Sequence, residues 1–141
     1  MKLLIINGPN LNLVGKREQD IYGFQAFTTY LKKLRKNYPD IHIDYVQTNI
    51  EGEIIDALHK DGFLYDGIIL NAGGYTHTSV AIADAVKAIT TRVIEVHISN
   101  TFARESFRHT SLIAPVVNGS IIGFGMESYR LAVESFRMIL K

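Results

Sequence analysis

A glutamate and a histidine two residues apart are the side chains in this sequence most suited to acid–base chemistry. Glu95 and His97 alternate with the apolar residues Ile94, Val96 and Ile98. Because successive side chains of a β-strand point to opposite faces of the sheet, Glu95 and His97 are expected to share one face. A carboxylate beside an imidazole can orient the ring and hold its proton. The pair therefore predicts an acid–base site, against the alternative of a structural buried histidine.

Two arginines follow this pair at a spacing typical of one helical face. Arg104 and Arg108 are four residues apart, so on a helical turn they would be neighbours. Guanidinium groups bind carboxylates and phosphates through paired hydrogen bonds. Close to a histidine, the two arginines indicate a site for an anionic ligand. The alternative is a solvated surface pair with Glu105.

A second polar segment, LNAGGYTHTS at 70–79, also follows an apolar run. Asn71 would stand at the end of a strand, and the two glycines after it would let the backbone approach a ligand closely. His77 leads into a helix N-terminus, a place that favours anions. A turn with an ordinary helix cap explains the segment equally well. A metal site of His77, His97 and Glu95 is not favoured, because no H-x-x-x-H spacing occurs and Glu95 is better placed to hold His97.

The segment NGPNLNLVGKREQDIYG, at 7–23, has the position of a phosphate-binding loop but not its spacing. That motif requires four residues between its glycines and a serine or threonine after its lysine. Here six residues separate Gly8 from Gly15, and Lys16 is followed by Arg17. A connection of this length is often a lid over a functional site. The lid is preferred to a plain surface loop, which would leave the arginine and the tyrosine of the segment unexplained.

Apolar runs and helical patterns alternate along the chain and define the elements that must position these residues. Short apolar runs predict five strands, at 3–6, 41–46, 67–70, 93–98 and 120–124. Apolar residues at helical spacing predict four helices, at about 24–38, 51–60, 80–89 and 127–140. Asn49 is expected to cap the second helix, and Thr78 or Ser79 the third.

This alternation predicts a flavodoxin-like, doubly wound α/β fold. Strand–helix–strand repetition implies a parallel sheet covered on both faces, here with five strands in the order 2-1-3-4-5. One domain would span residues 1–141. In such sheets, ligands bind outside the carboxyl ends of the strands, at the point where the strand order reverses. The three polar segments all fall at predicted strand ends.

The composition excludes several classes of function. The chain has 141 residues, 47% of them hydrophobic, a net charge of +1 and no cysteine. Disulfides, thiolate zinc sites and cysteine nucleophiles are therefore excluded. The near-neutral charge argues against nucleic-acid binding. No apolar stretch is long enough for a signal peptide or a membrane span, so we expect a soluble cytoplasmic protein without a membrane partner.

Three segments together resemble the type II 3-dehydroquinases, enzymes of the shikimate pathway of aromatic amino acid biosynthesis. They are NGPNLNLVGKRE…YG, ILNAGGYTHTS and IEVHISN…ARE.FR, and the likeness runs from the first strand to the last helix. The resemblance implies anti elimination of water from 3-dehydroquinate, through an enolate, to give 3-dehydroshikimate, with no cofactor or metal. The main departure is Gln19, where the family usually has proline, and it bears on the stiffness of the loop.

The resemblance also implies a set of catalytic residues. Tyr22 would be the base that removes the C2 proton, and Arg17 would stabilise the tyrosinate and the transition state. His97 would be the general acid that protonates the departing hydroxyl, with Glu95 as its partner. Asn10 would hold a water against the developing enolate.

The remaining implied residues bind the substrate or join subunits. The substrate's carboxylate and hydroxyls would be bound by Asn71, His77, Arg108 and the backbone of Ile98 and Ser99. Arg104 resembles a lid arginine that closes over the site. Asp84 resembles a residue that reaches the site of a neighbouring subunit, and the family assembles as dodecamers built from trimers.

The residue types are consistent with this chemistry. A tyrosine has a pKa of about 10 and is a poor base at neutral pH unless a nearby cation lowers that value. Arg17 precedes Tyr22 by five residues on the same loop, so the contact is feasible. An enolate needs hydrogen-bond donors at its oxygen, and a departing hydroxide needs an acid. No lysine lies in an apolar pocket motif, which favours a route without a Schiff base.

Three other functions would use the same fold. A flavodoxin-like nucleotide- or flavin-binding module would need the phosphate loop that the segment 7–23 lacks. A receiver-like signalling domain would need acidic residues where Asn7 and Asn10 stand. A structural oligomerisation domain would leave the polar pairs at the strand ends unexplained.

Overall fold

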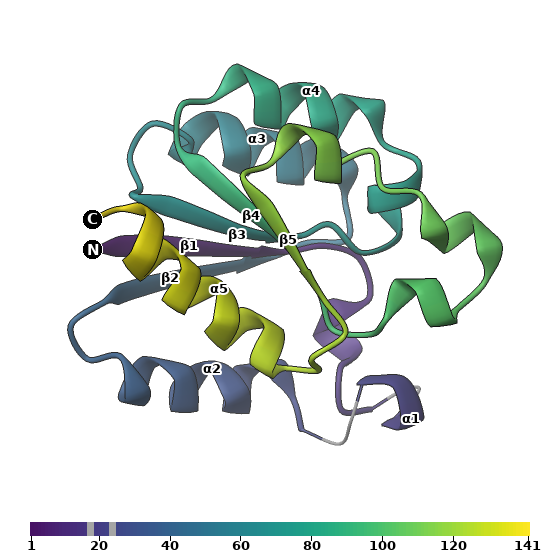
Figure 1. The fold of residues 1–141 in the computed structure, drawn as a ribbon, viewed down its shortest axis with the longest axis horizontal. Coiled ribbons are helices and arrows are strands. Elements are labelled where there is room, and N and C mark those ends of the chain that lie inside the picture. The colour runs from purple at the N-terminus through teal and green to yellow at the C-terminus, as the bar shows by residue number, and fades with distance from the viewer. Residues whose placement is uncertain (17–18, 23–24) are drawn as a thin grey trace.

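The structure is a computed structural model that describes residues 1–16, 19–22 and 25–141, with the backbone alone for residues 21 and 22. One parallel sheet holds five strands in the order β2-β1-β3-β4-β5 (Figure 1). The strands are β1 (Lys2–Asn7), β2 (His42–Gln47), β3 (Gly67–Asn71), β4 (Arg92–His97) and β5 (Gly119–Ile122). The predicted order is confirmed, and each strand begins within one residue of its predicted start.

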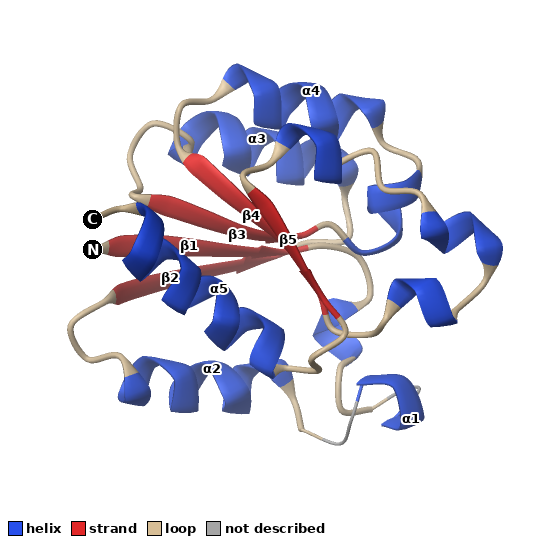
Figure 2. Cartoon of the chain, in the orientation of Figure 1, coloured by secondary structure: helices blue, strands red, loops and turns tan. Residues whose placement is uncertain are grey.

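Helices cover both faces of the sheet, as the alternation predicts (Figure 2). One face carries α2 (Phe27–Asn37) and α5 (Glu127–Ile139), and the other carries α3 (Glu51–Asp61) and α4 (Val80–Ala88). The short α1 (Gln19–Tyr22) lies in the connection after β1. None of the described helices is long and apolar enough to cross a membrane.

The strands are apolar on both sides because both sides are buried. Leu3 and Ile5 of β1 belong to the cluster beneath α2 and α5, and Leu4 and Ile6 belong to the cluster beneath α3 and α4. Two rings of α5, Tyr129 and Phe136, are fully buried in the first cluster. Burial of such rings contributes much of the free energy that stabilises a small domain.

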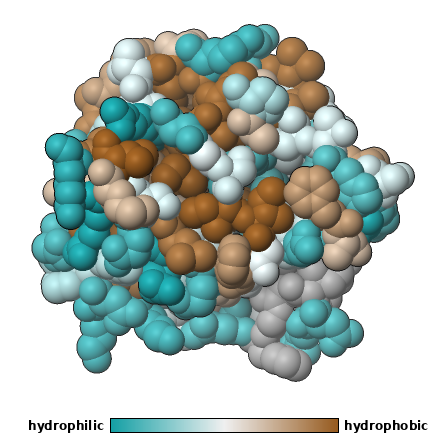
Figure 3. Space-filling model, viewed as in Figure 1, coloured by the Kyte–Doolittle hydropathy of each residue, from teal (hydrophilic) through white to brown (hydrophobic). Residues whose placement is uncertain are grey.

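The edge strand β5 is covered less completely. Its residues Ile121 and Ile122 are half-buried. Figure 3 shows apolar side chains gathered in the middle of this view, where Figure 1 places β5. The strand is nevertheless paired along its inner side, where its register sets Ser120 beside Glu95 of β4.

Of the two predicted helix N-caps, the structure confirms the one of α4 and contradicts the one of α3. Ser79 caps α4, and its Oγ accepts a hydrogen bond of 2.9 Å from the amide of Ile82. The prediction that Asn49 caps α3 is wrong, because no side chain makes a capping hydrogen bond at the start of this helix. Asn49 Oδ1 instead accepts a hydrogen bond of 3.0 Å from the amide of Asn10, in the loop after β1. The tertiary contact therefore replaces the local cap.

Candidate active site

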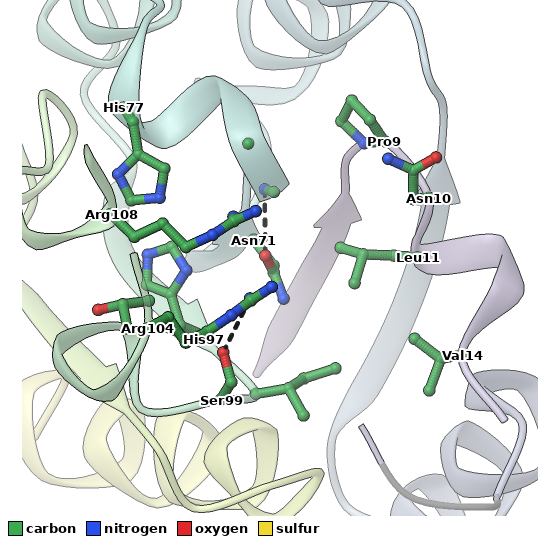
Figure 4. A pocket seen from close by; sticks show the side chains of 14 residues that line it. Pro9, Asn10, Leu11, Val14, Asn71, His77, His97, Ser99, Arg104 and Arg108 are labelled. Atoms are coloured by element: carbon green, nitrogen blue, oxygen red, sulfur yellow. Dashed lines mark hydrogen bonds between the residues drawn. The ribbon is translucent and has the colours of Figure 1, made fainter. Parts of the chain in front are cut away.

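A pocket opens at the carboxyl ends of β1, β3 and β4, where the doubly wound fold is predicted to bind ligands (Figure 4). It encloses about 130 Å³. It is lined by the last residues of β3 and β4 and by residues of the segments after the three strands: Pro9, Asn10, Leu11, Val14, Asn71, Gly73, Gly74, His77, His97, Ile98, Ser99, Thr101, Arg104 and Arg108. The three polar segments of the sequence therefore meet at one place.

The predicted pairing of Glu95 with His97 is present at the end of β4. His97 Nε2 lies 2.9 Å from Glu95 Oε1. Glu95 is fully buried, and His97 is 7% exposed and lines the pocket. The backbone of His97 is held from behind, because Ser128 Oγ of α5 donates to its carbonyl oxygen at 3.2 Å. The ring therefore faces the pocket from a fixed position.

Two serines complete the surroundings of the Glu95 carboxylate. Ser111 Oγ donates to Oε1 at 2.7 Å, and Ser120 Oγ donates to Oε2 at 2.6 Å. Burial by itself raises the pKa of Glu95. The hydrogen bond and the charge of His97, together with the hydrogen bonds from the two serines, lower it by more, so the pKa of Glu95 lies below its usual value. Glu95 is thus an ionised carboxylate that fixes the His97 ring. The sequence offered no local signal for either serine, since both lie far from Glu95 along the chain.

A second histidine stands over the first. His77 and His97 stack with ring centroids 6.4 Å apart and planes inclined by 21°. Figure 4 shows the two rings on the same side of the pocket. His77 Nδ1 lies 2.7 Å from the carbonyl oxygen of Thr110, which can only accept, so Nδ1 carries the hydrogen. This contact therefore identifies Nδ1 as the ring nitrogen of His77 that donates to the backbone.

The two arginines line the pocket, but not from one helical turn. The chain forms separate 3₁₀ turns at Thr101–Ala103 and Ser106–His109, so the predicted single turn is wrong. Arg104 Nη1 donates to Ser99 Oγ at 3.3 Å. Arg108 Nε lies 2.7 Å from Glu105 Oε2, so the alternative ion pair with Glu105 is also present. Both guanidinium groups border the cavity, which gives it a cationic wall.

Asn71, at the end of β3, and Asn10, in the loop after β1, lie on the other side of these cations. Asn71 Nδ2 donates to the hydroxyl of Tyr129 at 2.9 Å, and Asn71 Oδ1 accepts from the amide of Gly73 at 3.2 Å. Asn10 has a left-handed backbone with φ of 68°, a conformation that asparagine adopts more readily than most residues. Figure 4 shows Asn10 across the cavity from the arginines, with Asn71 between them.

Four of the predicted site residues are not among those that line the pocket, and one of them is Glu95, which is fully buried and contacts His97. Asp84 lies exposed on α4, where its Oδ1 is 3.3 Å from Nζ of Lys87. Arg17 lies outside the described residues, and so does the side chain of Tyr22, although the backbone of Tyr22 ends α1. Gln19, the departure from the family pattern, donates from Nε2 to the carbonyl of Gly15 at 3.1 Å.

The pocket combines acid–base and cationic groups. His97, held by the buried Glu95 carboxylate, forms one part of its wall, and two guanidinium groups form another. Such a wall suits a small anion that undergoes proton transfer. Across the described ranges, no group of three or more histidine, cysteine, aspartate or glutamate side chains could hold a metal ion.

Comparison with known proteins gives a consistent result over almost the whole chain. Residues 1–137 match a family model described as dehydroquinase class II. A 3-dehydroquinate dehydratase of Exiguobacterium sp. is 53% identical over 136 residues, which cover 96% of this chain and 93% of the relative. A 3-dehydroquinate dehydratase of Caldicellulosiruptor bescii is 49% identical over 142 residues, which cover 99% and 98%. A crystal structure of type II dehydroquinase from Butyrivibrio crossotus is similar with a TM-score of 0.94, at 42% identity over 97% of each chain.

Proposed function

Since this chain belongs to the class II dehydroquinase family, a family of hydro-lyases, we propose that it converts 3-dehydroquinate to 3-dehydroshikimate by anti elimination of water through an enolate. The observation that carries the proposal is the buried Glu95–His97 pair at the wall of a pocket that two arginines also line. The pair supplies an acid, and the arginines match a substrate carboxylate. No cofactor or metal takes part in the proposed reaction.

The proposed acid is His97. Hydroxide is a poor leaving group, so the departing hydroxyl must receive a proton. Imidazole is the side chain most often used for this purpose near neutral pH. The ionised Glu95 carboxylate, 2.9 Å away, orients the ring and stabilises its protonated form during the reaction. His97 would then act on a hydroxyl placed in the pocket.

The proposed base is Tyr22, assisted by Arg17. The base must remove the C2 proton next to a ketone, which leaves an enolate. Asn10 and a water that it holds would donate to the enolate oxygen. The support for this part of the proposal is the family membership together with the length of the loop, because Arg17 and the side chain of Tyr22 lie outside the described residues.

The proposed binding residues surround the acid. The substrate's carboxylate and hydroxyls would contact Asn71, His77, Arg108 and the backbone of Ile98 and Ser99, all of which line the pocket. Arg104 would close over the bound substrate. An Arg104 guanidinium that contacts Ser99 at 3.3 Å needs only a short movement to reach a ligand at this position.

The proposal extends to the assembly and to the biological setting. We propose a dodecamer of trimers in which Asp84 reaches the site of a neighbouring subunit. The exposure of Asp84 on α4, away from the pocket of its own chain, supports this role. We further propose a biosynthetic enzyme of the shikimate pathway that works in the cytoplasm.

The direct test is the absorbance of the conjugated product. The purified protein mixed with 3-dehydroquinate should produce a rising enone absorbance. His97→Asn should lower kcat by roughly 10²- to 10⁴-fold, the usual contribution of a general acid. His42→Asn is the matched control and should keep full activity, because His42 is an exposed histidine that pairs with Asp44 at the amino end of β2. Flat absorbance with the folded wild-type protein would reject the proposed function.

The base is tested separately. Tyr22→Phe should lower kcat by roughly 10²-fold or more, because it removes the group that takes the proton, while KM stays within about threefold. Tyr65→Phe is the control, since the Tyr65 hydroxyl contacts Asp44 at 2.7 Å and not the pocket. Near-wild-type turnover by Tyr22→Phe would show that another group is the base.

A further inference from the structure

Three buried polar side chains form a continuous hydrogen-bonded chain behind the pocket. The hydroxyl of Tyr129 donates to Asn7 Oδ1 at 2.8 Å and accepts from Asn71 Nδ2 at 2.9 Å. Asn7 and Tyr129 are fully buried, and Asn71 is 3% exposed and lines the pocket. The chain therefore links the first strand and the last helix to a side chain at the ligand cavity.

The direction of every hydrogen bond in this chain follows from one backbone amide. The amide of Gly73 can only donate, so the atom of Asn71 that lies 3.2 Å away must be its oxygen. Asn71 then turns its Nδ2 toward Tyr129, and the tyrosine oxygen accepts. The tyrosine proton is left for Asn7, whose oxygen must face it.

The fixed direction of these hydrogen bonds lowers the stability of the fold at one atom. Asn7 Nδ2 is buried and has no hydrogen-bond partner in the part of the chain that the structure describes. A buried amide left without a partner destabilises a fold. Burial also raises the pKa of Tyr129 far above its usual range, so the hydroxyl stays neutral and keeps both of its hydrogen-bond roles. The aromatic ring is fixed by Phe27, whose centroid lies 4.8 Å away.

We infer that Tyr129 is a positioning residue for the reaction, which holds the Asn71 amide in one orientation in the pocket. Held in this way, Asn71 keeps one N–H and one lone pair for a ligand hydroxyl. A substrate hydroxyl can donate to the oxygen and accept from the nitrogen at once. Without the Tyr129 hydroxyl, Asn71 Nδ2 loses its partner, and the side chain is held only at its oxygen by the amide of Gly73. The inference rests on the proposed function, in which Asn71 binds the substrate.

The test is Tyr129→Phe, which removes the hydroxyl and keeps the ring. With 3-dehydroquinate as the substrate, KM should rise roughly five- to tenfold, the effect of losing one neutral hydrogen bond. The value of kcat should stay within about twofold, because the contact is made equally in the ground state and the transition state. Tyr38→Phe is the matched control: it also removes the hydroxyl of a buried tyrosine, here one that donates to Glu134 of α5 at 2.6 Å, and Tyr38 does not line the pocket. That variant should keep the wild-type KM.

A double-mutant cycle separates positioning from a general loss of structure. In an Asn71→Ala background, adding Tyr129→Phe should change KM by less than about twofold, because the residue through which Tyr129 acts is absent. If the two effects on KM multiply instead, or if Tyr129→Phe alone leaves KM unchanged, the inference is wrong. Asn7→Ala provides a second variant if Tyr129→Phe does not fold, and it should also raise KM. A folded wild-type protein with no turnover would overturn the proposed function, and with it this inference.

Discussion

At the scale of single residues, Glu95 shows how a buried charge is kept in a protein core. An isolated ionised carboxylate is costly to bury, and it usually takes up a proton instead. Here donors from three side chains reach its two oxygens: His97, Ser111 and Ser120. Their combined effect keeps the pKa of Glu95 below its usual value despite burial. Each donor should therefore matter most when the carboxylate is ionised.

The contribution of one donor to the free energy of unfolding can be measured as a function of pH. Ser120→Ala should lower the free energy of unfolding by about 1.5–3 kcal/mol at pH 7, the range for a hydrogen bond to a charged group. A lowered folded-state pKa means that ionised Glu95 stabilises the fold above its unfolded pKa of about 4.3. That contribution is lost as the pH falls through the folded-state pKa. The difference between wild type and variant should therefore narrow toward acid pH.

A serine elsewhere in the chain provides the control for this series. Ser135 Oγ donates to the carbonyl of Leu131 at 2.8 Å within α5, with no carboxylate involved. The stability difference caused by Ser135→Ala should be the same at each pH. A difference for Ser120→Ala that is equally flat across denaturant titrations from about pH 3 to 7 would show that its hydroxyl does not stabilise the ionised form of Glu95.

At the scale of elements, the loops after β1 and β3 are packed backbone against backbone. The amide of Gly8 donates to the carbonyl of Asn71 at 2.7 Å. A Cβ atom at Gly8 would lie 2.7 Å from the carbonyl oxygen of Ala72, closer than real side chains approach. Gly73 has a φ of +60°, and its own Cβ would lie 3.1 Å from the carbonyl oxygen of Pro9. Both sides of the contact therefore favour glycine.

A glycine-to-alanine change should therefore destabilise the fold at this contact but not at a glycine with open space around it. Gly8→Ala should lower the free energy of unfolding by about 1–3 kcal/mol, because backbone atoms must move apart. Turnover should also fall roughly tenfold or more, since Asn10 and Asn71 lie next to the backbone segments that separate. Gly52→Ala is the control, because Gly52 lies in α3 with open space around it. That change should stabilise the fold by roughly 0.5–1 kcal/mol in the same denaturant titration. Equal stability of Gly8→Ala and wild type would contradict the tight packing.

At the scale of the whole molecule, the sequence predicts what depends on local periodicity. Strand starts and the shared face of Glu95 and His97 follow from patterns within a few residues, and the strand order follows from the alternation of strands and helices along the chain. The cap at Ser79 is equally local, and it is confirmed. Because parallel strands place their carboxyl ends along one edge, the same patterns also predict where the pocket forms.

The features that the sequence did not predict depend on contacts between distant segments. Ser120 contacts Glu95, which is 25 positions away, and Tyr129 contacts Asn71, which is 58 positions away, so no local pattern indicates either contact. Asn49 was expected to cap a helix, but a loop from elsewhere in the chain engages its side chain. The helical turn expected around Arg104 and Arg108 is replaced by two separate turns. The roles of Arg17 and Tyr22 stay predictions.

The first turn of α5 has a further consequence. Its Ser128 holds the backbone of His97, and its Tyr129 holds the side chain of Asn71. The parts of a protein that open most easily are those with few buried contacts, whereas Ser128 and Tyr129 are both fully buried. The pocket is thus supported by two buried side chains of α5, and we expect the backbone amides around them to exchange slowly. Any opening that frees α5 would therefore remove the supports of His97 and Asn71 together with the core.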